Sequence, residues 1–405
     1  MSFYLLPQIH NIISCKHVSI LINNEDDKCS GDNICNSGIS KSLHNYLNNI
    51  KKEIDLYSNE WDVFKKYTNP YEYIHTSIPY YKQSVCKLKP LSRSFFKLIE
   101  IVNLLSLYNV SDESNDSSDK INTFHLAEGP GGFIEAIEWF RNNPNDKYYG
   151  MTLISNDNNV PGWKKSSHFL SKHKNVIIET GISKNGDLSD KENLLYCLNK
   201  YRNTMDLVTG DGGFDFSIDF NKQESMCIKL LYYQISFALA IQKTGGNFIL
   251  KVFDIFTEAS VDLLYILSLC YEKIYIVKPY SSRYANSEKY IVCKNFKLED
   301  SREIVNHLSE NYELINNAKK ISRFLNIDIP YLFLNKLEEY NAIIGQQQIE
   351  NIVSTLYLIN NNNKPEKLES MKNINIQKCL QWCIKYNLPY VKNITENNIF
   401  VPLAE

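Results

Sequence analysis

Thr123–Phe140 reads TFHLAEGPGGFIEAIEWF, and the rest of the chain is organised around this stretch. Phe124–Ala127 predicts a short buried strand, and the glycine-rich run 129–132 predicts a turn. Apolar side chains then recur on one helical face: Phe133, Ile134, Ile137 and Phe140. Such a turn lets a ligand lie against unpartnered amide groups at a helix N-terminus. Many α/β proteins use glycines there only to turn the chain, so the downstream sequence has to show whether this turn binds a ligand.

Strand and helix signals alternate after this motif. The predicted strands are Lys147–Leu153, Asn175–Thr180, Met205–Gly210, Gly246–Val252, Lys273–Lys278 and Glu288–Cys293, with a helix over Asn221–Lys243. This alternation predicts a mostly parallel sheet with helices on both faces. The connection Pro279–Ser287 is too short for a crossover helix, so the last strand should be antiparallel. A seven-stranded α/β sheet of this kind resembles the class I (Rossmann-like) methyltransferase fold.

The flanking regions are less regular. Before the sheet we expect a strand at Val18–Ile22 and helices at Ser42–Phe64 and Arg93–Leu105. After it, residues 300–405 are expected to be helical at Glu303–Asn316, Pro330–Leu358 and Ile376–Tyr386. We therefore divide the chain into an N-terminal extension (1–79), a catalytic domain (80–298) and a helical C-terminal region (299–405).

Composition limits the possible partners. The 405 residues are 43% hydrophobic and 22% charged with a net charge of −2, so any nucleic-acid surface must be a local patch. The ten cysteines form no CxxC pair and no zinc-finger spacing, which favours reduced structural thiols and no metal. There is no signal-peptide pattern and no uncharged apolar run of about 18 residues, so we expect no membrane span.

Four ionisable residues stand where the strands and the preceding helix should meet. Asp211 follows a strand, Lys251 lies near the end of an apolar strand, Glu288 opens the last strand, and Lys97 is on the helix before the sheet. Ligands bind outside the carboxyl ends of strands in open α/β sheets. A lone strand lysine usually extends its ammonium group to the surface. Two lysines and two carboxylates that converge would instead form a proton-transfer site.

The segments AEGPGGF, VTGDGGFDFS, GGNFILKVF and KPYSSRYANSEKYIVC occur in this order. Together they resemble the FtsJ/RrmJ superfamily of S-adenosylmethionine-dependent RNA 2′-O-ribose methyltransferases. Within it the chain is most similar to Adrift-type cap methyltransferases and their relatives in large cytoplasmic DNA viruses. The resemblance covers roughly Tyr80–Leu358 and implies a Lys-Asp-Lys-Glu catalytic tetrad. Here the matching residues are Lys97, in SRSFFKLIE, followed by Asp211, Lys251 and Glu288.

The same resemblance implies a site for S-adenosyl-L-methionine. Its expected residues are Gly129, Pro130, Gly131, Gly132, Phe133, Asp187 and Asp211. Asp187 would contact the adenine, with a helix N-cap as the alternative role. Many class I enzymes have an acidic residue for the cofactor ribose after the second strand, but this chain reads Met151–Ser155 there, so ribose recognition stays unassigned. Lys251 would act as the base, with its pKa lowered by Lys97.

RNA is the expected substrate. Basic residues interleaved with tyrosines could contact phosphates: Lys82, Lys87, Lys89 and Arg93. Residues of the connection before the last strand would lie beside the target ribose: Ser281, Ser282, Arg283 and Asn286. A solvated face is the alternative for the basic cluster, and equally for a second basic and aromatic patch at Trp163–Lys174.

The sequence thus predicts methylation of a ribose near the 5′ cap of mRNA. Methylation of rRNA or tRNA and a non-catalytic RNA-binding subunit are the alternatives. Other capping enzymes are expected partners. The expected location is the host cytoplasm or the virion if the protein is viral, or the nucleus if it is cellular.

Overall fold

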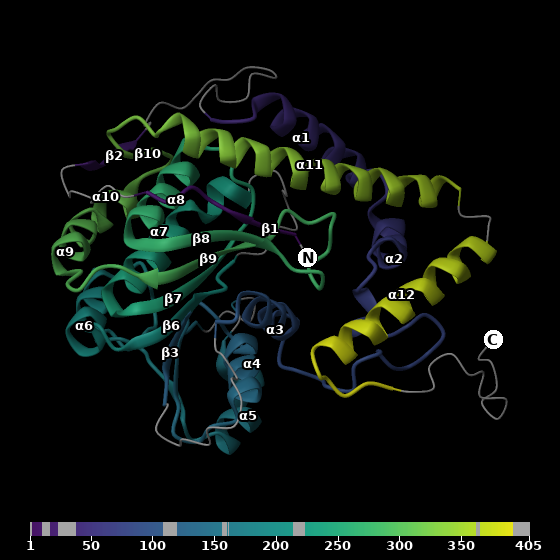
Figure 1. Ribbon diagram of the computed structural model, residues 1–405, viewed down its shortest axis with the longest axis horizontal. Coiled ribbons are helices and arrows are strands. Elements are labelled where there is room, and N and C mark those ends of the chain that lie inside the picture. The colour runs from purple at the N-terminus through teal and green to yellow at the C-terminus, as the bar shows by residue number, and fades with distance from the viewer. Residues whose placement is uncertain are drawn as a thin grey trace.

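An eight-stranded mixed sheet forms the centre of the protein (Figure 1). The computed structural model describes residues 2–9, 17–22, 38–107, 120–155, 160, 162–213, 223–361 and 365–391. The strand order is β1-β8-β9-β7-β6-β3-β4-β5. The seven predicted strands are present as β3 (Asn122–Leu126), β4 (Lys147–Met151), β5 (Val176–Ile178), β6 (Met205–Gly210), β7 (Gln242–Val252), β8 (Tyr271–Lys278) and β9 (Lys289–Phe296).

The strand directions match the prediction. β3 to β7 pair in parallel, whereas β9 pairs antiparallel with both β7 and β8. The eighth strand was not expected. It is β1 (Ser2–Leu5), which pairs antiparallel with β8 at the edge of the sheet.

Side chains alternate between two cores, one on each face of the sheet. Along β9, Tyr290 and Val292 pack into one core and Ile291 and Cys293 into the other, as the two-residue period of a strand requires. α3 (Ser94–Leu105) and α4 (Gly132–Arg141) cover the first face. α6 (Lys191–Tyr201), α7 (Gln223–Ile241) and α8 (Glu258–Cys270) cover the second. Helices on both faces leave the carboxyl ends of the parallel strands as the open edge.

Two predicted helices are each divided. The N-terminal one is α1 (Lys41–Asp55) and α2 (Ser58–Thr68), and the first C-terminal one is α9 (Arg302–Glu310) and α10 (Tyr312–Asn317). Neither break contains glycine or proline, so no local signal marks it. The C-terminal region also contains β10 (Ile321–Leu325), which forms a two-stranded antiparallel sheet with β2 (Val18–Ile22).

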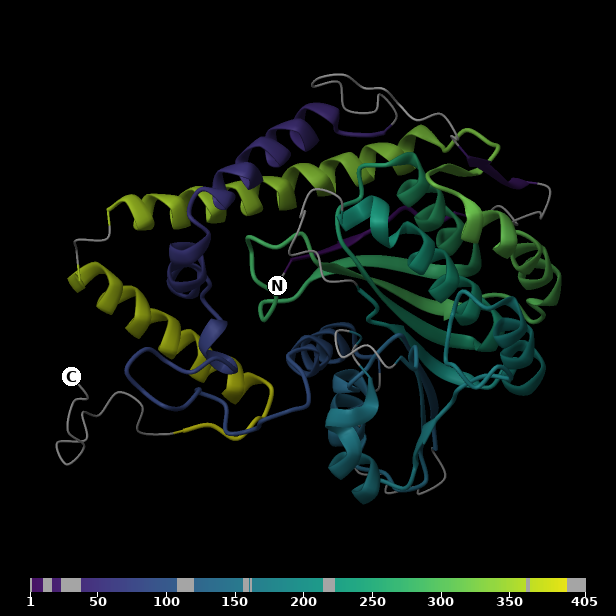
Figure 2. The ribbon, with the colours of Figure 1, turned by 180° about the vertical axis from the view of Figure 1, so that it is seen from behind.

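The helices before the central sheet pack against the helices after it (Figure 2). The long helix α11 (Tyr331–Asn360) runs beside α1, and α2 lies between α11 and α12 (Pro365–Lys385). The buried Lys51 of α1 forms an ion pair of 2.9 Å with Asp254, three residues after Lys251 in the catalytic region. Residues on both sides of the predicted catalytic domain therefore line its open edge. No helix in the described part of the chain is long and apolar enough to cross a membrane.

Candidate active site

The glycine turn after β3 enters α4 as predicted. Gly131 has φ 101°, a left-handed conformation that favours glycine, and it precedes the first residue of α4. A Cβ atom on Gly132 would lie 2.1 Å from Ser92 Oγ, so the segment leading into α3 can approach only because this residue is glycine. The turn is thus held between the sheet and α3.

Glu128 stabilises this turn, although the sequence analysis did not select it. Its Oε1 accepts hydrogen bonds from the main-chain N–H groups of Phe133 and Ile134, at the N-terminus of α4. Its Oε2 lies 3.1 Å from Nδ1 of the buried His125. Burial raises the pKa of Glu128, a shift that the hydrogen bond to His125 opposes. An acidic residue directly before the glycines was the available signal for this role.

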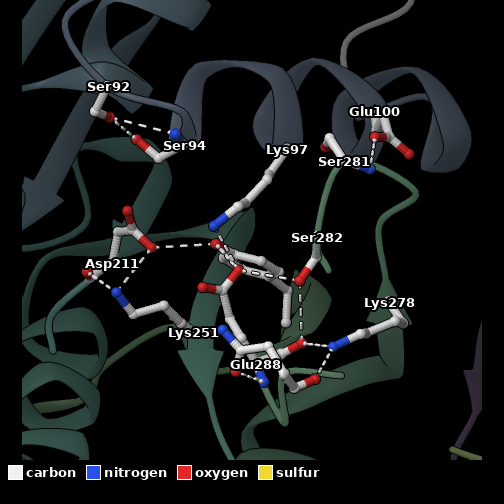
Figure 3. A network of polar contacts seen from close by, with 12 residues as sticks. Ser92, Ser94, Lys97, Glu100, Asp211, Lys251, Lys278, Ser281, Ser282 and Glu288 are labelled. Carbon is white, nitrogen blue, oxygen red and sulfur yellow. Dashed lines mark hydrogen bonds and ion pairs between the residues drawn. The ribbon is translucent and has the colours of Figure 1, made fainter. Parts of the chain in front are cut away.

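The four tetrad residues converge, as the sequence predicted (Figure 3). Lys97 extends from α3, Asp211 follows β6, Lys251 belongs to β7 and Glu288 precedes β9. They form two ion pairs, Lys97 Nζ–Glu288 Oε1 at 2.6 Å and Lys251 Nζ–Asp211 Oδ1 at 3.3 Å. Lys251 also donates to the main-chain oxygen of Asp211 at 2.6 Å. All four side chains are between 10% and 13% exposed.

Tyr290 joins the two ion pairs. Its hydroxyl lies 3.2 Å from Asp211 Oδ1 and 3.2 Å from Glu288 Oε1. Tyr290 is opposite Lys251 in the register of β7 and β9, and it is two residues from Glu288, so it projects from the same face. The sequence analysis missed it because a strand tyrosine has no distinctive spacing of its own.

The charge states in the site differ from one expectation. We predicted a lowered pKa for Lys251, but the pKa is raised, because Asp211 and Glu288 outweigh the burial that would lower it. Burial likewise favours neutral Glu288, yet Lys97 and Lys251 lower its pKa to about 2. Lys97 is held by Glu288 rather than directed at Lys251, so the expected repulsion between the lysines is not the dominant effect.

One cavity of about 910 Å³ connects the glycine turn to the tetrad. Its lining includes Gly129, Pro130, Asp187, Asp211, Lys251 and Glu288. Asp187 is not the N-cap of α6, because Asp190 accepts the capping hydrogen bond from Glu192. The carboxylate of Asp187 instead accepts from the N–H and the hydroxyl of Ser189. Its neighbour Gly186 has φ 64°, and a Cβ atom there would lie 2.1 Å from the Thr152 carbonyl oxygen. The close approach of this glycine to Thr152 keeps Asp187 at the cavity wall.

The predicted RNA contacts divide into three groups. Lys82, Lys87 and Lys89 are exposed but line neither this cavity nor the second one described below. Asn286 is exposed and lines both cavities. Arg283 lines the second cavity but is also paired internally, and Ser281, Ser282 and Arg93 line neither cavity.

Internal contacts correct the predicted positions beside the ribose. The buried Ser281 is held through its N–H group by Glu100 at 2.7 Å, and the buried Ser282 has its hydroxyl 3.4 Å from Glu288 Oε1. Arg283 donates twice to the fully buried Glu72 of the 3₁₀ helix η2 (Glu72–Ile74), at 2.6 and 2.9 Å. Burial lowers the pKa of Arg93, with the Arg283 guanidinium adding to the effect. In the second basic patch, Trp163 packs against Gly131 and Gly150.

The second cavity, of about 350 Å³, lies between the helical extensions and the Pro279–Ser287 connection. α1, α2 and α11 contribute to its walls, and Gln223 and Asn286 line both cavities. Its lining combines the indole of Trp61 with charged groups of both signs: Lys51, Asp55, Asp62, Lys65 and Arg283. No group of three or more His, Cys, Asp or Glu side chains that could hold a metal is present among the described residues.

The family description "FtsJ-like methyltransferase" matches residues 90–296, about half of the chain. The chain belongs to the FtsJ-like methyltransferase family. The chain is 35% identical over 224 residues to the mouse "Cap-specific mRNA (nucleoside-2'-O-)-methyltransferase 1", covering 53% of this chain and 26% of that protein.

It is also 31% identical over 245 residues to the Caenorhabditis briggsae "Inactive cap-specific mRNA (nucleoside-2'-O-)-methyltransferase 1B", covering 56% of this chain and 28% of that protein. A solved structure of a putative ribosomal RNA methyltransferase from Plasmodium falciparum is 19% identical, with a TM-score of 0.35, and covers 51% of this chain and 98% of that one. The chain thus spans about a quarter of the length of these two curated relatives.

Proposed function

We propose that this methyltransferase transfers a methyl group from S-adenosyl-L-methionine to a ribose 2′-hydroxyl near the 5′ cap of mRNA. The observation that carries the proposal is that Asp211, Lys251 and Glu288 line one cavity with the glycine turn, with Lys97 paired to Glu288. The names of the curated relatives support the cap as the substrate. One relative at 31% identity is named inactive, so similarity alone does not decide activity, and the complete tetrad is the stronger argument.

The residues around the glycine turn fit the methyl donor. The cavity is large enough for a nucleoside with an amino-acid chain, and it has a glycine-lined wall at one side and the carboxylate of Asp187 at the other. When bound, S-adenosyl-L-methionine supplies an electrophilic methyl group on a sulfonium cation. The protein then has to hold the ribose in line with that group and remove its proton.

Lys251 is the residue we assign to proton removal. Asp211 pairs with its ammonium group beside the cavity, and Lys97, paired with Glu288, would stabilise a developing oxyanion. The raised pKa of Lys251 means that it is protonated in the free site at neutral pH. A cation brought into the cavity disfavours a second cation, so a bound sulfonium would lower that pKa toward the working range.

The second cavity supports a capped rather than an internal RNA substrate. Trp61 can stack on a base, a contact that is stronger for a cationic base such as N7-methylguanine, and Asp62 can accept hydrogen bonds from the base edge. Because Asn286 and Gln223 line both cavities, a base in the second cavity would be close to a ribose at the tetrad. Internal RNA sites have no terminal base to occupy it.

The test is methylation of short RNAs that differ at one position. A capped RNA should accept one methyl group, the same RNA with a 2′-deoxy sugar at the target should accept none, and an uncapped RNA should be a much poorer substrate. Equal turnover of capped and uncapped RNA would favour the rRNA or tRNA alternative. Methylation of the deoxy RNA would show that the base is the acceptor, and RNA binding without turnover would favour the non-catalytic alternative.

Three further points stay predictions from the sequence: the similarity to Adrift-type and viral enzymes, the location in the cytoplasm, virion or nucleus, and the capping-enzyme partners. Fractionation of expressing cells tests the location, and pull-down with purified capping enzymes tests the partners.

A further inference from the structure

A third lysine, outside the tetrad, is buried behind Glu288. Lys278 is the last residue of β8 and is 2% exposed. Its Nζ donates to the main-chain oxygens of Asn286 and, at 2.7 Å, Glu288 (Figure 3). These bonds cross the base of the Pro279–Ser287 connection, so one side chain joins the residue before the connection to the residue after it.

The surroundings of Lys278 make its burial costly. Among the described residues it forms no ion pair, and both of its hydrogen-bond acceptors are neutral carbonyl groups. Glu288 and Asp254 face it with favourable charge, whereas Lys289 and Lys97 face it with unfavourable charge. Burial is the largest effect and lowers the pKa of Lys278 to about 7. A methionine would fill the same space without this penalty.

The contacts of Glu288 indicate what Lys278 does. The Glu288 carboxylate pairs with Lys97 at 2.6 Å and lies 3.2 Å from the hydroxyl of Tyr290. The main chain of Glu288 is held on one side by Lys278 and on the other by Asn286 Oδ1, which accepts its N–H at 2.9 Å. The direction of the carboxylate therefore depends on a main-chain position that Lys278 fixes.

We propose that Lys278 is a positioning residue of the methyl-transfer site, which clamps the main chain of Glu288 and so presents its carboxylate to Lys97. The expected effect on turnover rests on the proposed function, whereas the hydrogen bonds of the clamp do not depend on it. Two carbonyl acceptors need two N–H donors, which both the charged and the neutral amine carry. The clamp therefore persists when Lys278 titrates.

Replacing Lys278 should consequently affect turnover much more than stability. A lysine whose pKa is about 7 in the folded protein and 10.5 in the unfolded chain binds fewer protons when folded between these values, so charged Lys278 opposes folding. Replacing it with methionine removes that opposition. Lys278→Met also leaves the carbonyl groups of Asn286 and Glu288 without this donor, which offsets the gain. The variant should thus keep its Tm near neutral pH while kcat falls by about 10-fold to 100-fold, because a displaced catalytic group costs rate rather than folding.

The test compares Lys278→Met, Lys278→Gln and the control Lys294→Met in the full chain. Lys294 is also a strand lysine that donates to a main-chain carbonyl, that of Leu105 at 2.9 Å, but it is on β9 away from the tetrad. We expect the kcat loss in Lys278→Met with the affinity for S-adenosyl-L-methionine within about twofold, partial recovery in Lys278→Gln, whose amide retains two N–H donors, and no change in Lys294→Met.

Hydrogen exchange separates the clamp from the assigned activity. The peptide 279–290 should exchange faster in Lys278→Met than in the wild type or Lys294→Met, whatever the substrate proves to be. Unchanged exchange overturns the clamp, even if the enzyme methylates capped RNA. If the wild-type protein fails to methylate RNA but Lys278→Met still exchanges faster than the wild type, only the proposed function is overturned.

A structural role would look different. A fall in kcat that is accompanied by a clear fall in Tm in Lys278→Met, with no recovery of kcat in Lys278→Gln, would overturn the positioning role. If Lys278→Met does not fold, Lys278→Leu, which also lacks an N–H donor, carries the test. It should lower kcat and speed exchange of the peptide 279–290 at an unchanged donor affinity, and wild-type values for both would overturn the proposal.

Discussion

Lys97 on α3 donates to Glu288 at the start of β9, with 2.6 Å between Nζ and Oε1. This ion pair leaves Lys251 paired with Asp211, so each lysine has its own carboxylate. Separate pairs suit the two lysines to different roles in the proposed reaction. Lys251 faces the cavity beside the expected methyl donor, whereas Lys97 can act only on charge that develops during the reaction.

Lys251→Met should abolish methyl transfer while the affinity for S-adenosyl-L-methionine stays within a few-fold, because the residue is assigned to the proton and not to the donor. Donor binding by calorimetry and turnover with labelled donor measure the two effects. Lys243→Met is the matched control, since Lys243 is on the same strand but pairs with Asp206 at the opposite end. Substantial turnover in Lys251→Met would contradict the assignment.

Tyr290→Phe should lower kcat by about 10-fold, the equivalent of about 1.4 kcal/mol, because one hydroxyl supports both tetrad carboxylates. Losing the hydrogen bond to Glu288 also favours protonation of that carboxylate, so the acidic limb of the pH–rate profile should move to higher pH. Tyr275→Phe on β8 serves as the control. An unchanged pH profile would mean that the hydroxyl only fills space.

Asp187→Ala should weaken binding of S-adenosyl-L-methionine by about 1–3 kcal/mol while kcat at saturating donor changes little. Asp190→Ala provides the control, because Asp190 caps α6 and its loss should cost about 1 kcal/mol of stability without affecting the donor. Binding and thermal unfolding distinguish the two variants. Equal donor affinity in both would leave Asp187 without a cofactor role.

Trp61→Ala should raise the KM for capped RNA by about 5-fold to 150-fold, from the loss of 1–3 kcal/mol of base stacking. The KM for uncapped RNA of the same sequence should not change. Phe64→Ala, on the same helix but outside the cavity lining, is the control. A parallel loss on both RNAs would exclude the second cavity as a cap site.

Arg283→Met should destabilise the fold by about 3–5 kcal/mol, because it leaves the buried carboxylate of Glu72 unpaired. Arg283 lowers the pKa of Glu72 against the effect of burial, so the pair stabilises the fold above the unfolded pKa of 4.5. That stability is lost as the pH falls toward the folded pKa. The stability difference between wild type and Arg283→Met should therefore shrink in acid.

Arg323→Met distinguishes a structural arginine from an RNA contact. Arg323 forms a similar bidentate pair with the buried Asp262, away from both cavities. Similar losses of stability with an unchanged RNA KM in both variants would confirm that Arg283 is structural. A higher RNA KM in Arg283→Met alone would restore the original prediction that it contacts RNA.

The sequence by itself determined the sheet, the glycine turn and the tetrad. Burial on a strand or helix follows a period of two or 3.6 residues, and left-handed positions such as Gly131 favour glycine, so both leave local signals. Asp211 and Lys251 stand at the carboxyl ends of predictable strands, and parallel pairing of β6 with β7 brings these ends to one edge. Lys97 and Glu288 were selected from the motifs SRSFFKLIE and KPYSSRYANSEKYIVC.

Only the tertiary structure decided how these residues pair and what holds them. The Arg283–Glu72 pair joins residues 211 positions apart, and Tyr290 contacts Asp211, 79 positions away. Lys278 contacts the nearer Asn286 and Glu288, but only the folded Pro279–Ser287 connection brings their carbonyl groups to its ammonium group. The pKa of Lys251 likewise depends on the sum of burial and two carboxylates, whose balance no local pattern encodes. The edge strand β1 and the break between α1 and α2 were missed for the same reason, because their partners lie in distant parts of the chain.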